Sequence, residues 1–174
     1  MLKFLCLLFL IADIANAEDR TVVFKKVDAF GGRRNKYVYV KQAKGKTEIK
    51  WKTDVTETSS PLKATMYLHN IGTEEFNVFT LGNLCQEYKE GTFERNAQRF
   101  ILKAIANRDN CPIKKNTKAY IGDSITISQS NDNQPCGNYW VEFYIYAQND
   151  RENRIIYGQF TAAVTGCKMI NVYI

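Results

Sequence analysis

The sequence predicts a mainly β protein, an antiparallel β-sandwich or β-cup of about eight strands with one amphipathic helix. Two observations predict this class. Short segments in which hydrophobic and polar residues alternate recur along the chain, which is the period of half-buried strands. One stretch near residue 100 has helical spacing instead. The chain has 174 residues, of which 45% are hydrophobic, enough for one well-buried domain and too short for two ordinary ones.

The first half of the chain contains the most regular alternation. Strands are expected at residues 21–27, 37–40, 47–56, 62–69 and about 76–81. Within residues 62–69, Ala64, Met66 and Leu68 alternate with polar or amphipathic side chains. Turn residues such as the Gly-Gly-Arg-Arg-Asn run at 31–35 separate the segments. The pattern is typical of strands that bury one face.

The pattern changes after Gly91, where hydrophobic residues gather on one helical stripe. The stripe consists of Phe93, Ala97, Phe100, Ile101, Ala104 and Ile105. Thr92 is a suitable N-cap. The helix is expected to end near Asn107, because Asn-Cys-Pro at 110–112 combines turn chemistry with a proline.

The last part of the chain returns to strands. They are expected at about residues 125–127 and then at 138–146 and 154–164, with a polar connection at 148–153. Two sets of residues each share a face: Tyr139, Val141, Phe143 and Ile145, and Ile156, Phe160, Ala162 and Val164. This pattern predicts a hairpin that lines the core.

Residues 1–17 have the pattern of a secretory signal. Lys3 precedes a short apolar run, and Ala-Asn-Ala at 15–17 matches the small-x-small cleavage rule. The run is shorter than the about 20 residues that a membrane-spanning helix needs. An uncleaved anchor is the alternative. We expect a secreted, extracellular protein whose residues 18–174 form a single domain.

Cysteine usage agrees with secretion. Removal of the signal leaves Cys85, Cys111, Cys136 and Cys167. An even number in an oxidising compartment indicates two disulfides, although three pairings are possible. Zinc is the alternative, but no Cys-x-x-Cys spacing is present. We expect no metal and no cofactor.

The sequence offers little support for catalysis. His69 is the only histidine, and no Gly-x-Ser-x-Gly elbow accompanies it. Carboxylate pairs such as Glu74 and Glu75 fall in expected loops. A two-carboxylate glycosidase is the catalytic alternative that sequence spacing does not address. The prediction is a protein that is not an enzyme.

The second half of the chain carries the motifs of a known family. They are Cys-Pro-Ile-Lys at 111–114, Tyr120, Cys-Gly-Asn-Tyr-Trp-Val-Glu at 136–142 and Gln-Phe-Thr-Ala-Ala-Val-Thr-Gly at 159–166. Over residues 85–166 the chain resembles the ganglioside-activator β-cup proteins. It is also similar to the insect secreted chemosensory proteins called the CheB family and, more distantly, to the ML lipid-recognition domain.

The resemblance implies a secreted, non-enzymatic carrier or presenter of a hydrophobic ligand. The ligand class is a lipid, a glycolipid or a pheromone-like hydrocarbon held in an apolar cup, with a role in chemosensory perception. The resemblance also pairs Cys85 with Cys111. Cys136 and Cys167 then flank the last hairpin at one end, within reach of a second bridge.

A carrier needs an apolar cavity, and ligand sites occupy about 300 to 1,000 Å³. We expect such a void between the helix and the last hairpin. The candidate lining residues lie on inward faces: Met66, Leu68, Phe76, Phe100, Ile101, Ala104, Phe143 and Phe160. The alternative for each is a place in a solid core.

The basic residues suggest a second function. The formal net charge is +6. Arg33, Arg34, Lys44, Lys46 and Lys50 could hold the mouth of the cup against an anionic membrane or a charged head group, or could form a solvated face. The alternative to the carrier is a secreted interaction protein with a filled core that binds a receptor, glycan or anionic membrane. No nucleic-acid-binding motif is present, so nucleic acid is not an expected partner.

Overall fold

The computed structural model describes residues 20–32, 35–43, 46–122, 125–129 and 136–166, which form nine strands and one helix. The elements are β1 (Arg20–Gly31), β2 (Val38–Ala43), β3 (Lys46–Trp51), β4 (Leu62–Asn70), β5 (Phe76–Leu81), α2 (Phe93–Ala106), β6 (Lys118–Ile121), β7 (Ile125–Gln129), β8 (Gly137–Ala147) and β9 (Asp150–Thr165). All strand pairs are antiparallel. The predicted fold class is confirmed.

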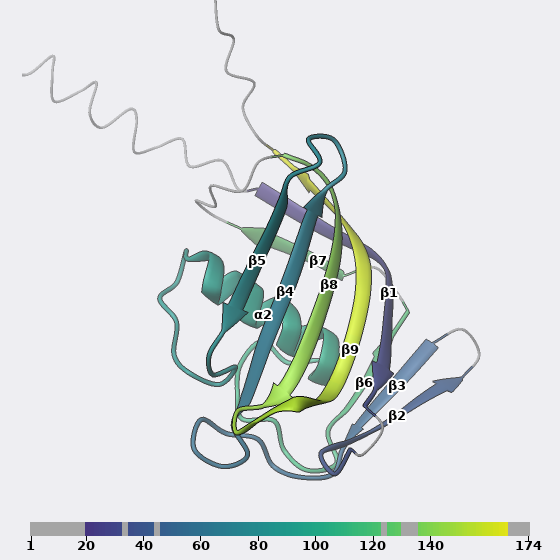
Figure 1. Cartoon of the computed structure of the whole chain (residues 1–174), viewed down its shortest axis with the longest axis vertical. Coiled ribbons are helices and arrows are strands. Elements are labelled where there is room, and N and C mark those ends of the chain that lie inside the picture. Colours follow the sequence, from purple (N-terminus) through teal and green to yellow (C-terminus); the bar gives the residue numbers. More distant parts are fainter. Residues whose placement is uncertain (1–19, 33–34, 44–45, 123–124, 130–135, 167–174) are drawn as a thin grey trace, which may run out of the picture.

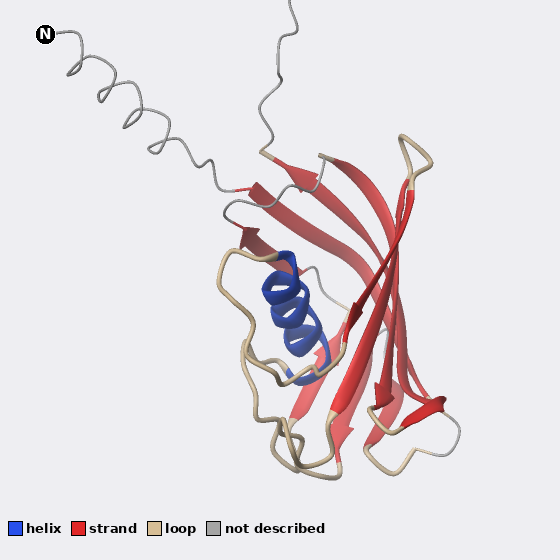
Figure 2. Ribbon diagram, turned by 60° about the vertical axis from the view of Figure 1, so that its left-hand side comes forward, coloured by secondary structure: helices blue, strands red, loops and turns tan. Residues whose placement is uncertain are grey.

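Six strands form one curved sheet in the order β5-β4-β8-β9-β1-β7, and a smaller sheet has the order β2-β3-β6. The helix α2 lies behind the large sheet in Figure 1 and inside its curve in Figure 2. The smaller sheet lies at the lower end of the cup in Figure 1. The large sheet therefore has an inner face, which the helix covers, and an outer face on its other side.

Alternation along the strands decides which side chains reach the inner face. In β4 every second residue is buried, beginning with Leu62. Met66 of β4 lies opposite Phe143 of β8, and Val141 of β8 lies opposite Phe160 of β9. These residues belong to one continuous hydrophobic core together with the buried side of the helix.

Aromatic rings fill the centre of this core. The ring of Phe100, on the helix, has its centroid 3.9 Å from that of Phe24, 4.6 Å from that of Phe160 and 6.4 Å from that of Phe143. Phe143 lies over Gly158 so closely that a β-carbon at position 158 would collide with the ring. The helix and the sheet are thus joined by direct ring contacts.

The helix begins and ends where the sequence predicts. Thr92 accepts a hydrogen bond from the backbone N–H of Arg95 at 3.3 Å, which makes it the N-cap. Asn107 ends the helix in the left-handed conformation, with φ of 52°. Near this end, the indole nitrogen of Trp51 donates to the carbonyl of Ile105 at 2.9 Å, and this contact attaches the helix to β3.

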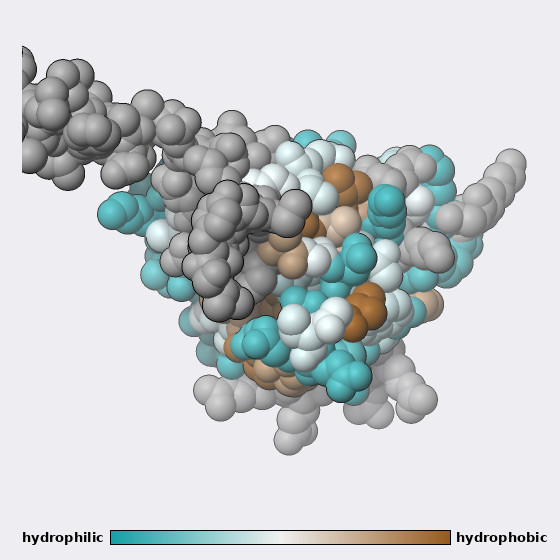
Figure 3. Space-filling view, turned by 90° about the horizontal axis from the view of Figure 1, so that it is seen from above, coloured by the Kyte–Doolittle hydropathy of each residue, from teal (hydrophilic) through white to brown (hydrophobic). Residues whose placement is uncertain are grey.

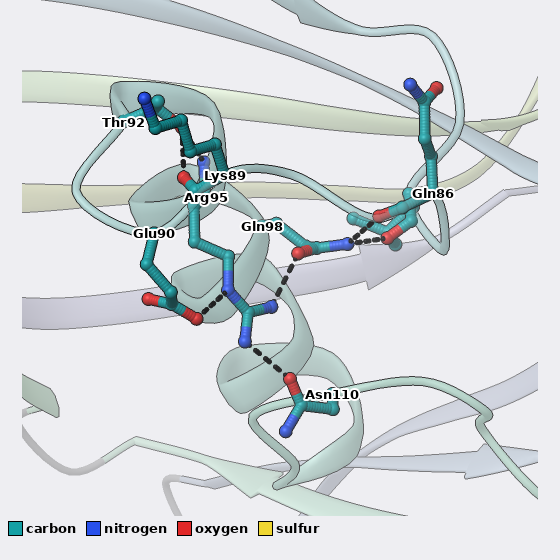
Figure 4. Close-up of polar contacts among 8 residues, drawn as sticks. Gln86, Lys89, Glu90, Thr92, Arg95, Gln98 and Asn110 are labelled. Carbon is teal, nitrogen blue, oxygen red and sulfur yellow. Dashed lines mark hydrogen bonds and ion pairs between the residues drawn. The ribbon is translucent and has the colours of Figure 1, made fainter.

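A polar network attaches the other end of the helix to its flanking loops (Figure 4). The guanidinium of Arg95 donates to Glu90, Gln98 and Asn110 at 2.8, 2.7 and 2.6 Å. The buried amide of Gln98 in turn donates to two backbone carbonyls of the preceding loop, each at 2.8 Å. Both helix ends are therefore held by hydrogen bonds.

A disulfide joins the same two loops. Cys85 is bonded to Cys111, with 5.5 Å between their Cα atoms. This pairing, implied by the family resemblance, is confirmed. The second predicted bridge involves Cys167, which lies outside the described residues, as does the signal segment at 1–17. Within the described ranges, no helix is long and apolar enough to cross a membrane.

One strand was not predicted. β6 is four residues long and pairs with β3 along Thr47 to Lys50. Its alternation of Ala119 and Ile121 with outward residues spans too few positions to be distinguished from a loop by sequence alone. β9 also begins earlier than expected, at Asp150, so the polar connection to β8 is a tight turn.

Candidate ligand-binding site

An apolar cavity of about 30 Å³ lies between the first half of the helix and the inner face of the large sheet. Its lining residues are Val22, Phe24, Met66, Leu68, Phe93, Asn96, Ala97, Phe100, Tyr139, Val141, Phe160, Ala162 and Val164. They come from β1, β4, α2, β8 and β9, which converge toward the end of the cup where β1 begins. Seen from that end, hydrophobic residues lie among hydrophilic ones (Figure 3).

The structure brings half of the predicted cavity residues together at this site. Met66, Leu68, Phe100 and Phe160 line the cavity. The others that we expected there, Ile101, Ala104 and Phe143, are buried in the core but do not form its wall.

Phe76 lies on the other side of the sheet. It is 60% exposed and pairs with His69 on the outer face. The prediction placed it inward because β5 carries hydrophobic residues at both parities, for example Val78 and Phe79. The pairing with β4 sends Phe79 inward, opposite Met66, and therefore sends Phe76 outward.

The cavity is much smaller than expected. About 30 Å³ is the space of roughly one water molecule, whereas ligand sites begin at about 300 Å³. The reason is the cluster of rings around Phe100, which occupies the space between the helix and the hairpin. The expectation of an open void of several hundred Å³ is wrong for this conformation.

One polar side chain interrupts the apolar wall. Asn96 is 5% exposed, and its amide nitrogen has no hydrogen-bond partner among the described residues. Asn96 lies on the same helical stripe as Phe93 and Phe100, three residues after the first and four before the second. An unsatisfied buried donor costs about 1 to 3 kcal/mol. Sequence reasoning passed over this residue, although a polar residue within an apolar stripe was visible in the spacing.

The other polar group of the wall is already engaged. The hydroxyl of Tyr139 accepts a hydrogen bond from the buried amide of Asn70 at 3.3 Å. The carbonyl oxygen of that amide accepts from the backbone N–H groups of Gly72 and Thr73. The Tyr139 hydroxyl is therefore fixed by the β4–β5 turn, in contrast to the Asn96 amide nitrogen.

The two predicted basic residues that the structure describes do not lie at the rim of the cavity. Lys46 and Lys50 lie on β3 in the smaller sheet, near the Gly31 end of β1. The cavity instead lies near Val22, nine positions away along that strand, which corresponds to roughly 30 Å. Arg33, Arg34 and Lys44 lie outside the described residues. Strand connectivity, which the sequence does not reveal, separates the two features.

The described residues contain no group of three or more His, Cys, Asp or Glu side chains that could hold a metal ion. The cavity wall offers apolar contact and the unpaired amide donor of Asn96.

Comparison with known proteins adds little to this geometry. No protein-family model matches the sequence, and a search of curated proteins finds no match. Among solved structures, the chain is similar to a Niemann-Pick type C2 protein from Japanese carpenter ant, with 12% sequence identity. The match covers 79% of this chain and 88% of that chain, with a TM-score of 0.31. At that level of similarity, function has to be argued from the cavity itself.

Proposed function

We propose that the protein is a non-enzymatic carrier of a hydrophobic ligand, which binds between α2 and the inner face of the large sheet. The ligand is an amphiphile with one aliphatic chain and an oxygen that can accept a hydrogen bond. In a secreted protein, this activity would serve extracellular delivery of a lipid-like molecule, such as a chemosensory signal. The family resemblance of residues 85–166 supports the same function.

The observation that carries the proposal is the unpaired amide of Asn96 in an otherwise apolar wall. In a core that is always filled, an apolar residue at this position would avoid a cost of about 1 to 3 kcal/mol. A ligand carbonyl, ester or hydroxyl oxygen would accept the hydrogen bond and remove that cost. The amide also favours an oxygenated ligand over a plain hydrocarbon, because a hydrocarbon would leave the donor unsatisfied.

Binding requires the cavity to widen. The helix ends are held by Trp51 and by the Arg95 network, so we assign the widening to side chains. Met66 is flexible, and Phe93 packs edge-on against Phe79 at the margin of the core. The ligand would select a minor conformation in which these side chains turn aside.

The energetics allow such a ligand. Burying a chain of about twelve methylenes contributes on the order of 10 kcal/mol, at about 0.8 kcal/mol each. Association and side-chain ordering offset part of this gain. At the low end of the association cost, about 4 kcal/mol, a remainder of about 6 kcal/mol corresponds to a dissociation constant of tens of micromolar.

A second candidate function is an interaction protein that acts through the outer face of the smaller sheet. The small size of the cavity favours it. On that face Lys50 lies between Tyr39 and Lys118, and Glu48 lies between Lys41 and Tyr120. The two tyrosines are 51% and 61% exposed, so the face combines exposed rings with basic groups and suits an anionic partner.

Displacement of a fluorescent acyl probe tests the carrier proposal. A fatty acid methyl ester and an alkane of equal chain length form a matched ligand pair. The carrier predicts that both displace the probe and that the ester binds more tightly, because only the ester accepts a hydrogen bond from Asn96. In Asn96→Leu the preference for the ester should disappear.

Native mass spectrometry of the purified protein is the complementary measurement. Co-purifying lipid would support the carrier. A protein that is isolated empty and binds no probe would contradict it. If that protein also bound anionic vesicles or glycans with an affinity that falls steeply with salt, the second function would be correct.

A further inference from the structure

The outer face of the large sheet carries a row of aromatic side chains. Ring centroids are 5.9 Å apart for Phe30 and Tyr157, 5.0 Å for Tyr157 and Tyr144, 5.5 Å for Tyr144 and Tyr67, and 5.9 Å for Tyr67 and Phe76. The row crosses the sheet from β1 to β5. Tyr67, Tyr144 and Tyr157 each stand between buried residues of their strand, so their side chains lie on the face away from the core. Large exposed hydrophobic side chains gathered on one face commonly mark a binding surface.

A cavity of about 320 Å³ lies at the β5 end of this row. It is lined by Tyr67, His69, Glu74, Phe76, Trp140, Glu142 and Tyr144. The strand register places these residues side by side: His69 lies between Phe76 and Trp140, and Tyr67 lies opposite Glu142. The volume is within the range of small-molecule sites.

The charge of this cavity is opposite to that of the chain. Its lining contains Glu74 and Glu142 and no lysine or arginine, whereas the chain as a whole carries +6. Neither carboxylate forms an ion pair within the described part of the chain. Glu142 is held in place by the hydroxyl of Tyr144, which donates to it at 2.7 Å.

The rings of this face already accommodate one cation. The guanidinium carbon of Arg154 lies 5.2 Å from the ring centroid of Tyr144. A cation over an aromatic face is attracted by the ring quadrupole, most strongly when the cation is weakly hydrated. The face thus shows, within the protein itself, the interaction that an external cation would make with Tyr67, Phe76 and Trp140.

We propose that the cavity formed by Tyr67, Phe76, Trp140, Glu74 and Glu142 binds a quaternary ammonium group. The aromatic rings supply cation–π contacts, and the two carboxylates supply charge complementarity. A quaternary ammonium suits the rings better than a primary ammonium, because it is more weakly hydrated and loses less hydration when it contacts the aromatic faces. This site lies on the opposite side of the sheet from the apolar cavity and does not depend on the proposed carrier function.

The group can come from two sources, a free cation such as choline or the head group of a phosphatidylcholine bilayer. Both present the same trimethylammonium chemistry, so the site itself does not distinguish them. A vesicle-binding measurement separates the two sources.

Titration of the ¹⁵N-labelled full chain with choline tests the proposal by nuclear magnetic resonance. The chain has two tryptophans. The indole of Trp140 lines the site, whereas that of Trp51 is buried and donates to Ile105, so it serves as an internal reference. Choline should shift the Trp140 indole signal and leave the Trp51 signal unchanged, with a dissociation constant on the order of 1 mM.

The neutral isostere 3,3-dimethylbutan-1-ol controls for shape. It has the outline of choline without the charge, so it should bind at least about fivefold more weakly. Equal binding of the two would overturn the proposal. So would the absence of a Trp140 shift at choline concentrations well above the expected constant, or a shift produced by glucose and not by choline.

Two carboxylate variants complete the test. Glu142→Gln removes the charge and keeps an oxygen acceptor for Tyr144, and it should weaken choline binding about two- to fivefold. Glu87→Gln, an exposed carboxylate outside the site, is the matched control and should bind choline as the wild type does. Equal affinities for the two variants would overturn the role of Glu142.

Vesicle co-sedimentation then identifies the source. Binding to phosphatidylcholine vesicles that free choline competes away, and that Glu142→Gln weakens, would identify the lipid head group. Choline binding in solution without such vesicle binding would identify a free cation. Both results support the site, and loss of choline binding in solution contradicts it whatever the vesicles show.

Discussion

The same strands build both faces of the large sheet. The site at each face includes a residue whose polarity differs from that of the side chains around it. The inner face is apolar, yet the helix that covers it contributes the unpaired amide of Asn96 to the cavity between them. The outer face is exposed, yet it presents Phe76 and Trp140 beside the carboxylate of Glu142. Residues that break a local pattern without an evident structural compensation mark candidate functional positions. The comparison therefore assigns one candidate site to each face.

Aromatic rings serve different purposes on the two faces. Phe143 is fully buried on the inner face and contacts Phe100 and Phe160. The next residue, Tyr144, points to the outer face, where its hydroxyl is hydrogen-bonded. Inner rings contribute to stability through burial, whereas outer rings keep polar partners and remain accessible. Adjacent residues thus give a direct test of the difference.

The largest effect is expected from truncating the inner ring. Phe143→Ala removes a fully buried ring and should lower the free energy of unfolding by about 3 to 5 kcal/mol. Tyr144→Ala, one position along the same strand, should cost less than about half as much, because its ring is partly exposed and leaves no closed cavity. Urea denaturation of both variants measures the difference. Equal losses would show that the two faces do not differ in this way.

The next largest effect concerns the cover of the inner face. The bridge between Cys85 and Cys111 closes a loop with a sequence separation of 26. Replacing both residues by alanine should lower the free energy of unfolding by roughly 3 to 4 kcal/mol in the chain-entropy model. Because the bridge joins loops that flank the helix, the variant should also admit an acyl probe more readily.

Choline binding on the outer face is the control for this variant. The quaternary ammonium site lies on β4, β5, β8 and the turn between β4 and β5. Its affinity should stay at the wild-type value under conditions where the variant remains folded. A parallel loss of both binding activities would mean that the two faces are not independent.

These expectations rest on features that sequence could predict to different degrees. The alternation in residues 62–69 predicted β4 and its buried side, and the apolar stripe with Thr92 and Asn107 at its ends predicted the helix. Periodicity reports such features because burial repeats with the backbone. Periodicity could not predict which face of the sheet Phe76 lies on, because both odd and even positions of β5 carry hydrophobic residues. Only the pairing of β5 with β4 determines the face.

The size and location of the sites were beyond sequence reasoning for other reasons. The void expected behind Phe143 is filled by Phe100, and ring positions depend on packing across elements that are distant in sequence. The outer cavity joins Tyr67 to Glu142, which are 75 positions apart and become neighbours only through strand pairing. Lys50 lies within the strand predicted at residues 47–56 and Lys46 lies just before it, but the distance of both residues from the cavity follows from topology.

A smaller effect is expected from replacing Asn96, and this replacement should raise the free energy of unfolding instead of lowering it. Asn96→Leu removes an unsatisfied donor from an apolar wall and should raise the free energy of unfolding by about 1 to 2 kcal/mol in the absence of ligand. Thermal unfolding of the delipidated protein measures this change. The matched control is Asn83→Leu. Asn83 accepts a hydrogen bond from the backbone N–H of Cys85, so its replacement should lower the free energy of unfolding. A loss of stability in Asn96→Leu would mean that the amide has a structural role, and the carrier proposal would lose its main support.

The smallest effect is expected from the outer face and appears only at high pH. Burial, together with the hydrogen bond to Glu142, raises the pKa of Tyr144 above its usual value near 10, and burial also raises the pKa of Tyr146 and Tyr157. In the unfolded chain these hydroxyls lose their protons first, so the unfolded state binds fewer protons than the folded state above about pH 10. The contribution of these tyrosines to the free energy of unfolding should therefore be constant below about pH 10 and should fall as the pH rises further. Tyr144→Phe removes one of the groups and should make the fall between pH 10 and 11 shallower in urea titrations. An unchanged slope in Tyr144→Phe would show that the environment of this ring does not raise its pKa.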